Sequence, residues 1–288
     1  MDLPVSEIIT GRKCFFVFPD TSLILPSYLE EYFSLGYECY FIEYGKKAPV
    51  QKIIKTIITL FKDVIIFFNI DYPLPDLEWD DVIEKLIEEK GDTSSFGVIY
   101  TKRQSVAEKV KMEKKYLYDM GLQCGCIQLE YQKKTNFELI AKALFANQAQ
   151  GRRKTIRALC TSTCTYTFFY GDKQTSYSGS LQDISLSHFS IIIPPDEMPI
   201  KLYEKIKDFR FNIQGLIFSS DAVLMMERQV LNGHLCDFAF LNSSGGNGLD
   251  PRIKLLLIPT LYKLLSTNIN LIIDHELLDM RKQNQLED

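Results

Sequence analysis

Five short apolar runs, separated by amphipathic stretches, organise the first half of the chain. The runs cover residues 13–18, 38–44, 64–69, 96–101 and 125–131. Several are apolar at successive positions, which is typical of a parallel strand covered on both faces. The stretches between them repeat apolar side chains at helical spacing, as in Ile54, Ile57, Ile58 and Phe61. We therefore expect a doubly wound parallel sheet built by right-handed βαβ crossovers.

The second half of the chain has a different pattern. From residue 155 to 241 the helical spacing gives way to short β-rich runs at residues 166–170, 185–193, 211–218, 223–226 and 235–240. Turn sequences such as Asn232-Gly233-His234 separate them, which indicates a small antiparallel β-barrel. A closing helix should follow, with Pro259 near its first turn and one face formed by Leu257, Leu261, Leu264 and Leu265.

Length and composition agree with two globular domains. The chain has 288 residues, of which 46% are hydrophobic, so burial can offset the ordering entropy and disorder is excluded as the main state. The junction lies near residues 147–153. We therefore expect an α/β domain over residues 1–149 and a barrel domain over residues 150–288.

Charge and cysteine content limit the kinds of ligand and the cellular locations that the sequence favours. The 33 basic and 37 acidic residues leave a net charge of −4, which argues against a general nucleic-acid binder. The apolar run Val64–Phe68 is far too short to cross a bilayer, and the N-terminus lacks the pattern of a signal peptide. The seven cysteines are irregularly spaced, as expected of reduced thiols in a cytoplasm. We expect no membrane insertion and a cytoplasmic location.

The order and length of the first-half elements resemble the receiver domain of bacterial response regulators, which has a flavodoxin-like fold. In that family a phosphorylatable aspartate follows the third strand, where this chain has Asn69. Thr101 is present after the fourth strand, but Gln128 or Glu130 stands where the family has lysine, and Asp20 is the one acid after the first strand. The resemblance thus implies a pseudo-receiver without phosphotransfer chemistry. A generic α/β module is the alternative.

A cluster of cations marks the junction between the two halves. The segment Gly151-Arg152-Arg153-Lys154-Thr155-Ile156-Arg157 holds four cations and no acid. Guanidinium groups bind phosphate in bidentate fashion and stack on planar rings, so the cluster suits a phosphate-bearing ligand. A solvated linker is the alternative interpretation.

A second element follows this cluster. Arg153 and Arg157 form R-x-x-x-R, and after two strand-like segments the chain reads Asp183-Ile184-Ser185-Leu186-Ser187-His188. Together these resemble the signature of the PilZ domain, a bacterial receptor for cyclic di-GMP: R-x-x-x-R at the entry to a six-stranded barrel, then D/N-x-S-x-x-G on its surface. The resemblance covers roughly residues 150–266 and implies a barrel with a closing helix.

The resemblance also implies a role for each matching residue. Arg153 and Arg157 would clamp the phosphates and stack against guanine, with Arg152 assisting by charge. Asp183 would accept hydrogen bonds from the guanine edge, and Ser185 would complete the polar floor. In the alternative interpretation, Asp183 and Ser185 are a turn-stabilising pair between strands.

One position departs from the family pattern. His188 stands where the family has glycine, a residue that allows close backbone approach. Its ring could block the ligand or stack on guanine. The sequence thus leaves two functions open: a bacterial cyclic di-GMP effector that acts on an unknown protein partner, or a degenerate adaptor that binds protein without nucleotide.

Enzyme and metal functions have weaker support. We expect no enzyme activity, cofactor or metal, although a small-molecule enzyme could use the carboxyl edge of the sheet near Asp20, Asn69 and Asp71. The spacing of Cys160 and Cys164 does not match that of a zinc site. We interpret these cysteines as small buried hydrophobes.

Overall fold

The structure is a computed structural model that describes residues 5–43, 48–61, 63–75, 77–89, 94–101, 105–151, 155–171, 175–195 and 200–287. Contacts divide these residues into two units. One contains Thr155–Asn268, and the other contains Val5–Lys154 together with Ile269–Asp288. The sequence-based boundary placed the whole C-terminal helix with the barrel, whereas its last part groups with the α/β unit. The two units are described separately.

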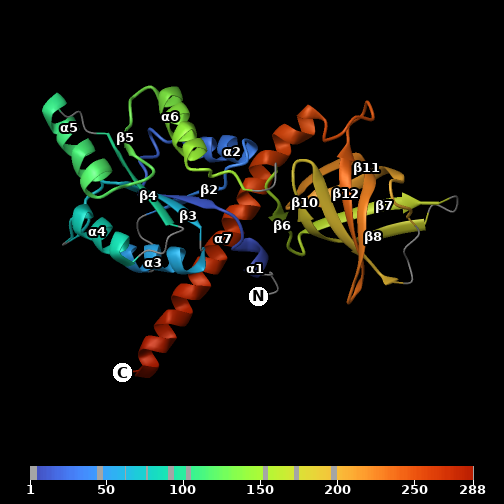
Figure 1. Cartoon of the computed structure of the whole chain (residues 1–288). Coiled ribbons are helices and arrows are strands. Elements are labelled where there is room, and N and C mark those ends of the chain that lie inside the picture. The colour runs from blue at the N-terminus through green and yellow to red at the C-terminus, as the bar shows by residue number, and fades with distance from the viewer. Residues whose placement is uncertain are drawn as a thin grey trace. The chain divides into compact units, whose positions relative to one another are not determined.

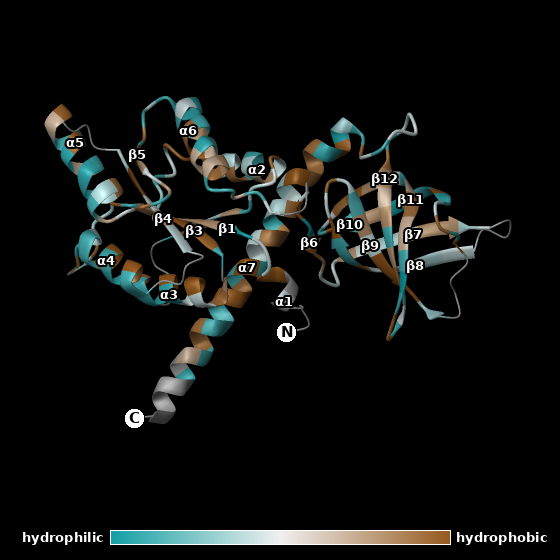
Figure 2. Cartoon of the chain, viewed as in Figure 1, coloured by the Kyte–Doolittle hydropathy of each residue, from teal (hydrophilic) through white to brown (hydrophobic). Residues whose placement is uncertain are grey.

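The α/β unit is built on a five-stranded parallel sheet. Its strands are β1 (Lys13–Val17), β2 (Cys39–Ile42), β3 (Val64–Asn69), β4 (Ser94–Tyr100) and β5 (Cys126–Gln128). Their order is β2-β1-β3-β4-β5, the flavodoxin-like order that the sequence predicts. Every residue of β1 and β3 is buried, and the central strands are mostly brown in Figure 2. The successive apolar side chains of these strands therefore follow from cover on both faces.

The following helices accompany this sheet. They are α1 (Val5–Ile8), α2 (Pro26–Ser34), α3 (Val50–Leu60), α4 (Trp79–Glu89), α5 (Val106–Glu113) with its π-helical extension η1 (Lys114–Asp119), and α6 (Lys133–Ala146). Helices α2 and α6 lie on one face and α3 and α4 on the other (Figure 1). Stacking of Tyr32 on Phe137, with ring centroids 4.7 Å apart, joins α2 to α6. The apolar stripe predicted from Ile54 and Ile57 is buried on α3.

The second unit is an antiparallel barrel. Its strands are β6 (Ala158–Leu159), β7 (Cys164–Tyr170), β8 (Thr175–Ile184), β9 (His188–Ile193), β10 (Lys205–Ile213), β11 (Leu216–Val230) and β12 (Gly233–Leu241). The order is β6-β8-β7-β10-β11-β12-β9, and pairing of β8 with β9 closes six of these strands into a barrel. The predicted fold class, a flavodoxin-like sheet followed by a small barrel and a helix, is confirmed.

The observed bounds of several barrel strands differ from the predicted ones. The run at residues 211–218 crosses a hairpin, because Gln214 and Gly215 adopt φ values of 50° and 95° between the paired residues Ile213 and Leu216. Such positive φ values are those of a two-residue hairpin turn. The second strand-like segment before Asp183, for which the sequence predicted no bounds, is β8; its residues TSYSGSLQDI are mostly polar and exposed along the first half of the strand.

Aromatic rings fill the barrel. Phe189 of β9 lies at the centre of this core and is fully buried. Its ring centroid lies 4.9–5.2 Å from the rings of Phe209, Phe211, Phe238 and Phe240. Because side chains alternate across a strand, His188 and Ser190 point to the outside of the barrel.

Helix α7 (Pro251–Glu287) follows the barrel. The predicted face is confirmed: Leu257, Leu261, Leu264 and Leu265 are all buried. Pro259 lies inside the helix rather than in its first turn. Proline lacks the N–H that would bond to the carbonyl of Leu255, and the exposed position of Leu255 lets water take that place.

The first thirty residues of α7 are long and apolar enough to cross a membrane. Within Pro251–Met280 the most apolar window of 18 residues has a mean hydropathy of 1.4, and 44% of that window is buried within the protein. Within the barrel unit the Asn268 amide donates to the Leu159 carbonyl oxygen at 3.0 Å. Within the α/β unit the Thr56 hydroxyl lies 3.6 Å from the Met280 sulfur. Both contacts show that α7 packs against other parts of the protein along its length.

The aromatic core gives a stability prediction. Phe189→Ala removes a fully buried ring with four aromatic neighbours, so we expect a loss of about 3–5 kcal/mol in the free energy of unfolding. Phe169→Ala is the matched control, since that ring is 46% exposed and lies on β7, another strand of the same barrel. Urea denaturation of the full chain, followed by circular dichroism, measures both. Equal losses would contradict the assignment of Phe189 to the core.

Candidate functional site

The structure describes four of the six residues predicted to bind ligand. Arg157, Asp183, Ser185 and His188 belong to the barrel unit. Arg152 and Arg153 lie outside the described residues. The geometry below therefore concerns the second half of the predicted R-x-x-x-R pair and the element that follows it.

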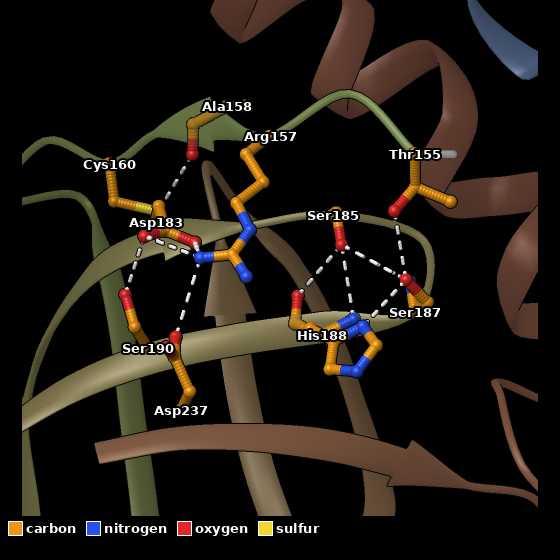
Figure 3. A network of polar contacts seen from close by, with 10 residues as sticks. All are labelled: Thr155, Arg157, Ala158, Cys160, Asp183, Ser185, Ser187, His188, Ser190 and Asp237. Carbon is orange, nitrogen blue, oxygen red and sulfur yellow. Dashed lines mark hydrogen bonds and ion pairs between the residues drawn. The ribbon is translucent and has the colours of Figure 1, made fainter. Parts of the chain in front are cut away.

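Strand register brings three polar side chains together on the outside of the barrel. Ser190 of β9 is opposite Asp183 of β8 on one side and opposite Asp237 of β12 on the other. The neighbours of these residues, Ile184, Phe189 and Phe238, are fully buried in the core. The polar side chains consequently share the outer face (Figure 3). The Ser190 hydroxyl donates to Oδ2 of Asp183 at 2.7 Å.

Arg157 lies over this group of side chains. Its Nη1 is 3.4 Å from Oδ1 of Asp183 and 3.4 Å from Oδ1 of Asp237. The three side chains retain 25%, 14% and 11% of their exposure, respectively, so the charges are partly shielded from water. One guanidinium group therefore contacts two carboxylates at the edge of hydrogen-bonding distance. The described part of the site carries a local excess of one negative charge.

Ser185 has a structural role. It is fully buried, and its Oγ accepts from the backbone N–H of His188 at 3.0 Å and from that of Ser187 at 3.3 Å. The Ser185 N–H donates to the His188 carbonyl oxygen at 2.8 Å. These bonds define the turn between β8 and β9, as in the turn-stabilising interpretation of this serine.

His188 extends from the outer face at the start of β9. Its Nδ1 lies 2.8 Å from the Ser187 hydroxyl, which in turn lies 2.9 Å from the Thr155 hydroxyl. Burial lowers the pKa of His188, the positive charge of Arg157 lowers it further, and Asp237 and Asp183 oppose the shift. The ring is therefore mainly neutral near pH 7. A neutral ring can stack on a base without adding charge to the site.

Sequence reasoning missed Asp237 and Ser190. Both lie within runs predicted as strands, and neither belongs to a recognisable motif. Their position at the site follows from barrel closure, which places β9 between β8 and β12. The alternation of buried and exposed positions could have placed them on the outer face, but only the strand order shows that they meet Arg157.

The polar residues at the carboxyl edge of the parallel sheet are engaged in hydrogen bonds within the α/β unit. The Asn69 amide donates to the Phe18 carbonyl oxygen at 2.8 Å, and the Thr101 hydroxyl donates to Oδ2 of Asp71 at 2.7 Å. Asp20 accepts from the Ser22 hydroxyl at 2.6 Å. Asn69 stands where the resemblance to receivers places the phosphorylatable aspartate, and its amide is used here to bind the Phe18 carbonyl.

A cavity of about 300 Å³ lies at the same edge. It is lined mostly by apolar residues, with Glu43 and Gln51 as its polar members, and none of Asp20, Asn69 and Asp71 lines it. The enzyme hypothesis needs convergent polar groups in a pocket. This cavity does not have that character. Among the residues that the structure describes, no cluster of His, Cys, Asp or Glu could hold a metal ion.

The shifted pKa of His188 can be measured directly. We expect its imidazole to titrate below the ordinary value of about 6.5, because burial and Arg157 both disfavour the charged form. In Arg157→Ala the midpoint should rise, since a nearby positive charge is removed while Asp183 and Asp237 remain. A titration followed by imidazole ¹⁵N NMR measures both midpoints. A midpoint that is unchanged or lower in the variant would contradict the contribution of Arg157.

Comparisons with known proteins give structural neighbours only. No protein-family model and no curated protein sequence matches the chain. It is similar to the PilZ domain with c-di-GMP of YcgR from Escherichia coli, with 19% identity over 39% of this chain and 91% of that chain, and a TM-score of 0.33. YcgR in complex with c-di-GMP from Escherichia coli matches at 15% identity over 47% of this chain and 50% of that chain, with a TM-score of 0.30. The Bacillus subtilis inhibitor of motility (MotI/DgrA) matches at 8% identity over 42% and 54%, with a TM-score of 0.32.

Proposed function

We propose that the outer face of the barrel binds cyclic di-GMP at Arg157 and Asp183. The observation that carries this proposal is their contact: 26 residues apart in sequence, they meet at 3.4 Å on one partly shielded face. They belong to the two separate parts of the signature that the chain shares with PilZ domains. A guanidinium group beside a carboxylate offers a donor for phosphate and an acceptor for the guanine edge.

Charge supports the same ligand. Arg152, Arg153, Lys154 and Arg157 carry four positive charges, and Asp183 and Asp237 carry two negative ones. The resulting excess of two positive charges matches the two phosphates of cyclic di-GMP. Guanidinium groups bind phosphate through parallel hydrogen bonds, which the exposed side of Arg157 can supply. The site therefore suits a small dianion better than a polymer.

Ligand binding requires an exchange of partners at Arg157. In the free protein its Nη1 contacts both carboxylates. A phosphate that binds the guanidinium group competes with these contacts, and a guanine that donates to Asp183 uses the released carboxylate. Binding thus replaces protein ion pairs with ligand contacts, and the net affinity is the difference between them.

We further propose a non-enzymatic bacterial effector of cytoplasmic location that passes the signal to a protein partner. The boundary between the two units falls at Lys154 and Thr155, inside the cation cluster. Capture of a ligand by residues on both sides of this boundary would change the relative orientation of the units. Such coupling requires a difference in ligand affinity between the two arrangements, typically worth ~1–3 kcal/mol.

The alternative is an adaptor that does not bind nucleotide. Two observations favour it: Arg157 is already paired with two carboxylates, and His188 stands where the PilZ signature has glycine. His188→Gly separates the two functions. If only this variant bound cyclic di-GMP, the adaptor interpretation would be correct for the natural chain.

Calorimetry with cyclic di-GMP tests the proposed function. We expect saturable binding by the full chain, and a loss of affinity of at least about tenfold in Arg157→Ala, because a phosphate then loses a charge-assisted hydrogen bond. Arg210→Ala is the matched control, since Arg210 is a barrel arginine that pairs with Asp208 on an exposed surface. Absence of heat with the natural chain at high concentration would refute the proposal.

Asp237 should act against ligand binding. Asp237→Asn keeps the shape of the side chain but removes one of the two carboxylates that contact Arg157. We expect cyclic di-GMP to bind about three- to tenfold more tightly, in line with the loss of one weak competing ion pair. Asp208→Asn is the control, because it removes an exposed acid that contacts Arg210. Weaker binding by Asp237→Asn would show that Asp237 helps to hold the ligand.

A further inference from the structure

The apolar cavity at the carboxyl edge of the parallel sheet is formed by three segments of the α/β unit. Phe18 follows β1, Glu43 follows β2, and Leu74 lies in the connection between β3 and α4. Val50 and Ile53 add a wall from the first turns of α3. The volume of about 300 Å³ lies at the lower end of the range of small-molecule sites, roughly 300–1,000 Å³. The cavity therefore has room for a small ligand.

Phe18 lines this cavity in an unusual backbone conformation. Its φ value is 51°, in the left-handed region that bulky side chains rarely adopt. Two hydrogen bonds hold it there: its N–H donates to the Ile42 carbonyl oxygen at 2.8 Å, and its own carbonyl accepts from the Asn69 amide at 2.8 Å. Asn69 is itself 6% exposed. Such strain persists where the surrounding bonds enforce it, and it is found at ligand sites. The wall is therefore fixed before any ligand arrives.

Aromatic packing supports the ring of Phe18 from behind. Its ring centroid lies 4.7 Å from that of Tyr72 and 6.1 Å from that of Trp79, the first residue of α4. The Trp79 indole N–H donates to the Tyr72 carbonyl oxygen at 2.7 Å, which fixes the two rings relative to each other. Trp79 is the single tryptophan of the chain. Its spectroscopic signals therefore report on this wall of the cavity.

Charge selects the kind of ligand that suits the cavity. Among the described residues that line it, Glu43 is the one charged residue, and all others except Gln51 are apolar. A ligand that fills the cavity also covers the carboxylate of Glu43. A neutral ligand would remove water from this carboxylate without replacing its hydrogen bonds, an anion would be repelled, and a cation would pair with it. The first turn of α3 opposes a cation with only about half a unit of positive charge, which is less than the charge of a carboxylate.

We propose that this cavity binds a small organic cation, in which a short chain joins an aromatic ring to an ammonium group. The ring would pack against Phe18, Ile53 and Leu74, because apolar walls that include an aromatic side chain favour an aromatic body. The ammonium group would pair with the carboxylate of Glu43. The site lies in the α/β unit, and its ligand is opposite in charge to cyclic di-GMP. The inference thus goes beyond the proposed function and does not depend on it.

Titration of the full chain with three related compounds tests the proposal. The compounds 2-phenylethylamine, 2-phenylethanol and phenylacetate share one ring and differ in charge. Binding is followed by the single indole N–H signal of Trp79 in ¹H–¹⁵N NMR and by tryptophan fluorescence. We expect the amine to shift this signal saturably, with a dissociation constant of about 1 mM or lower. It should bind about three- to tenfold more tightly than the alcohol, and the acid should bind most weakly.

Variants separate the charge of the cavity from its shape. Glu43→Gln should lower the affinity for the amine to that for the alcohol, and Val50→Phe should weaken both by filling the space. Glu31→Gln is the matched control, since it removes an exposed acid from α2, on the opposite face of the sheet from α3 (Figure 1).

Three results would overturn the proposal: no saturable shift with the amine, equal or tighter binding of the acid, or an advantage of the amine that survives in Glu43→Gln. The comparison of the three compounds on the natural chain decides the question if a variant fails to fold.

Discussion

Closure of the barrel by pairing of β8 with β9 is the constraint on which the candidate site depends. Asp183, Ser190 and Asp237 come from three strands, and they become neighbours only because β9 pairs with β8 on one side and with β12 on the other. The same register sends Phe189 into the core, where it packs against four aromatic rings. The core and the group of Asp183, Ser190 and Asp237 therefore form together when the barrel closes. The strands that carry these side chains hold them in fixed positions.

Because the barrel strands hold Asp183 and Asp237 in place, the two carboxylates compete for the guanidinium group of Arg157. Its contacts with Asp183 and Asp237 are long, at 3.4 Å, and each is weaker than a short bidentate pair. Such contacts hold the guanidinium group over the barrel face and still leave it open to exchange. Ser190 strengthens this arrangement, because its hydroxyl bonds to Asp183 and keeps that carboxylate beside Arg157.

The sequence predicted those features that depend on local patterns. A strand such as β3, which is buried on both faces, can be predicted from its successive apolar residues. The buried face of α7 can be predicted from the spacing of its leucines. Strand β8 could not be delimited from sequence because its first half is exposed and rich in serine, threonine and glycine, so it lacks the apolar signal of a strand. Asp237 was missed for a different reason: its contact with Arg157 depends on strand order, which no local pattern encodes. Ser185 matched a motif, yet its hydroxyl bonds to the turn, since a short polar side chain serves a turn as readily as a ligand.

Local charge, rather than the average, decides what this chain can bind. A net charge of −4 describes 288 residues, but charges separated by more than a screening length of about 8 Å contribute little to one another in physiological salt. Among the described residues, Arg157 faces the two carboxylates of Asp183 and Asp237, and three further cations precede Thr155 in the sequence. The carboxylates are anchored by the strands, whereas the cations lie on the segment where one unit gives way to the other. In the proposed function, a dianion that drew these cations to the barrel face would act on the connection between the units, because the cations belong to that connecting segment of the chain.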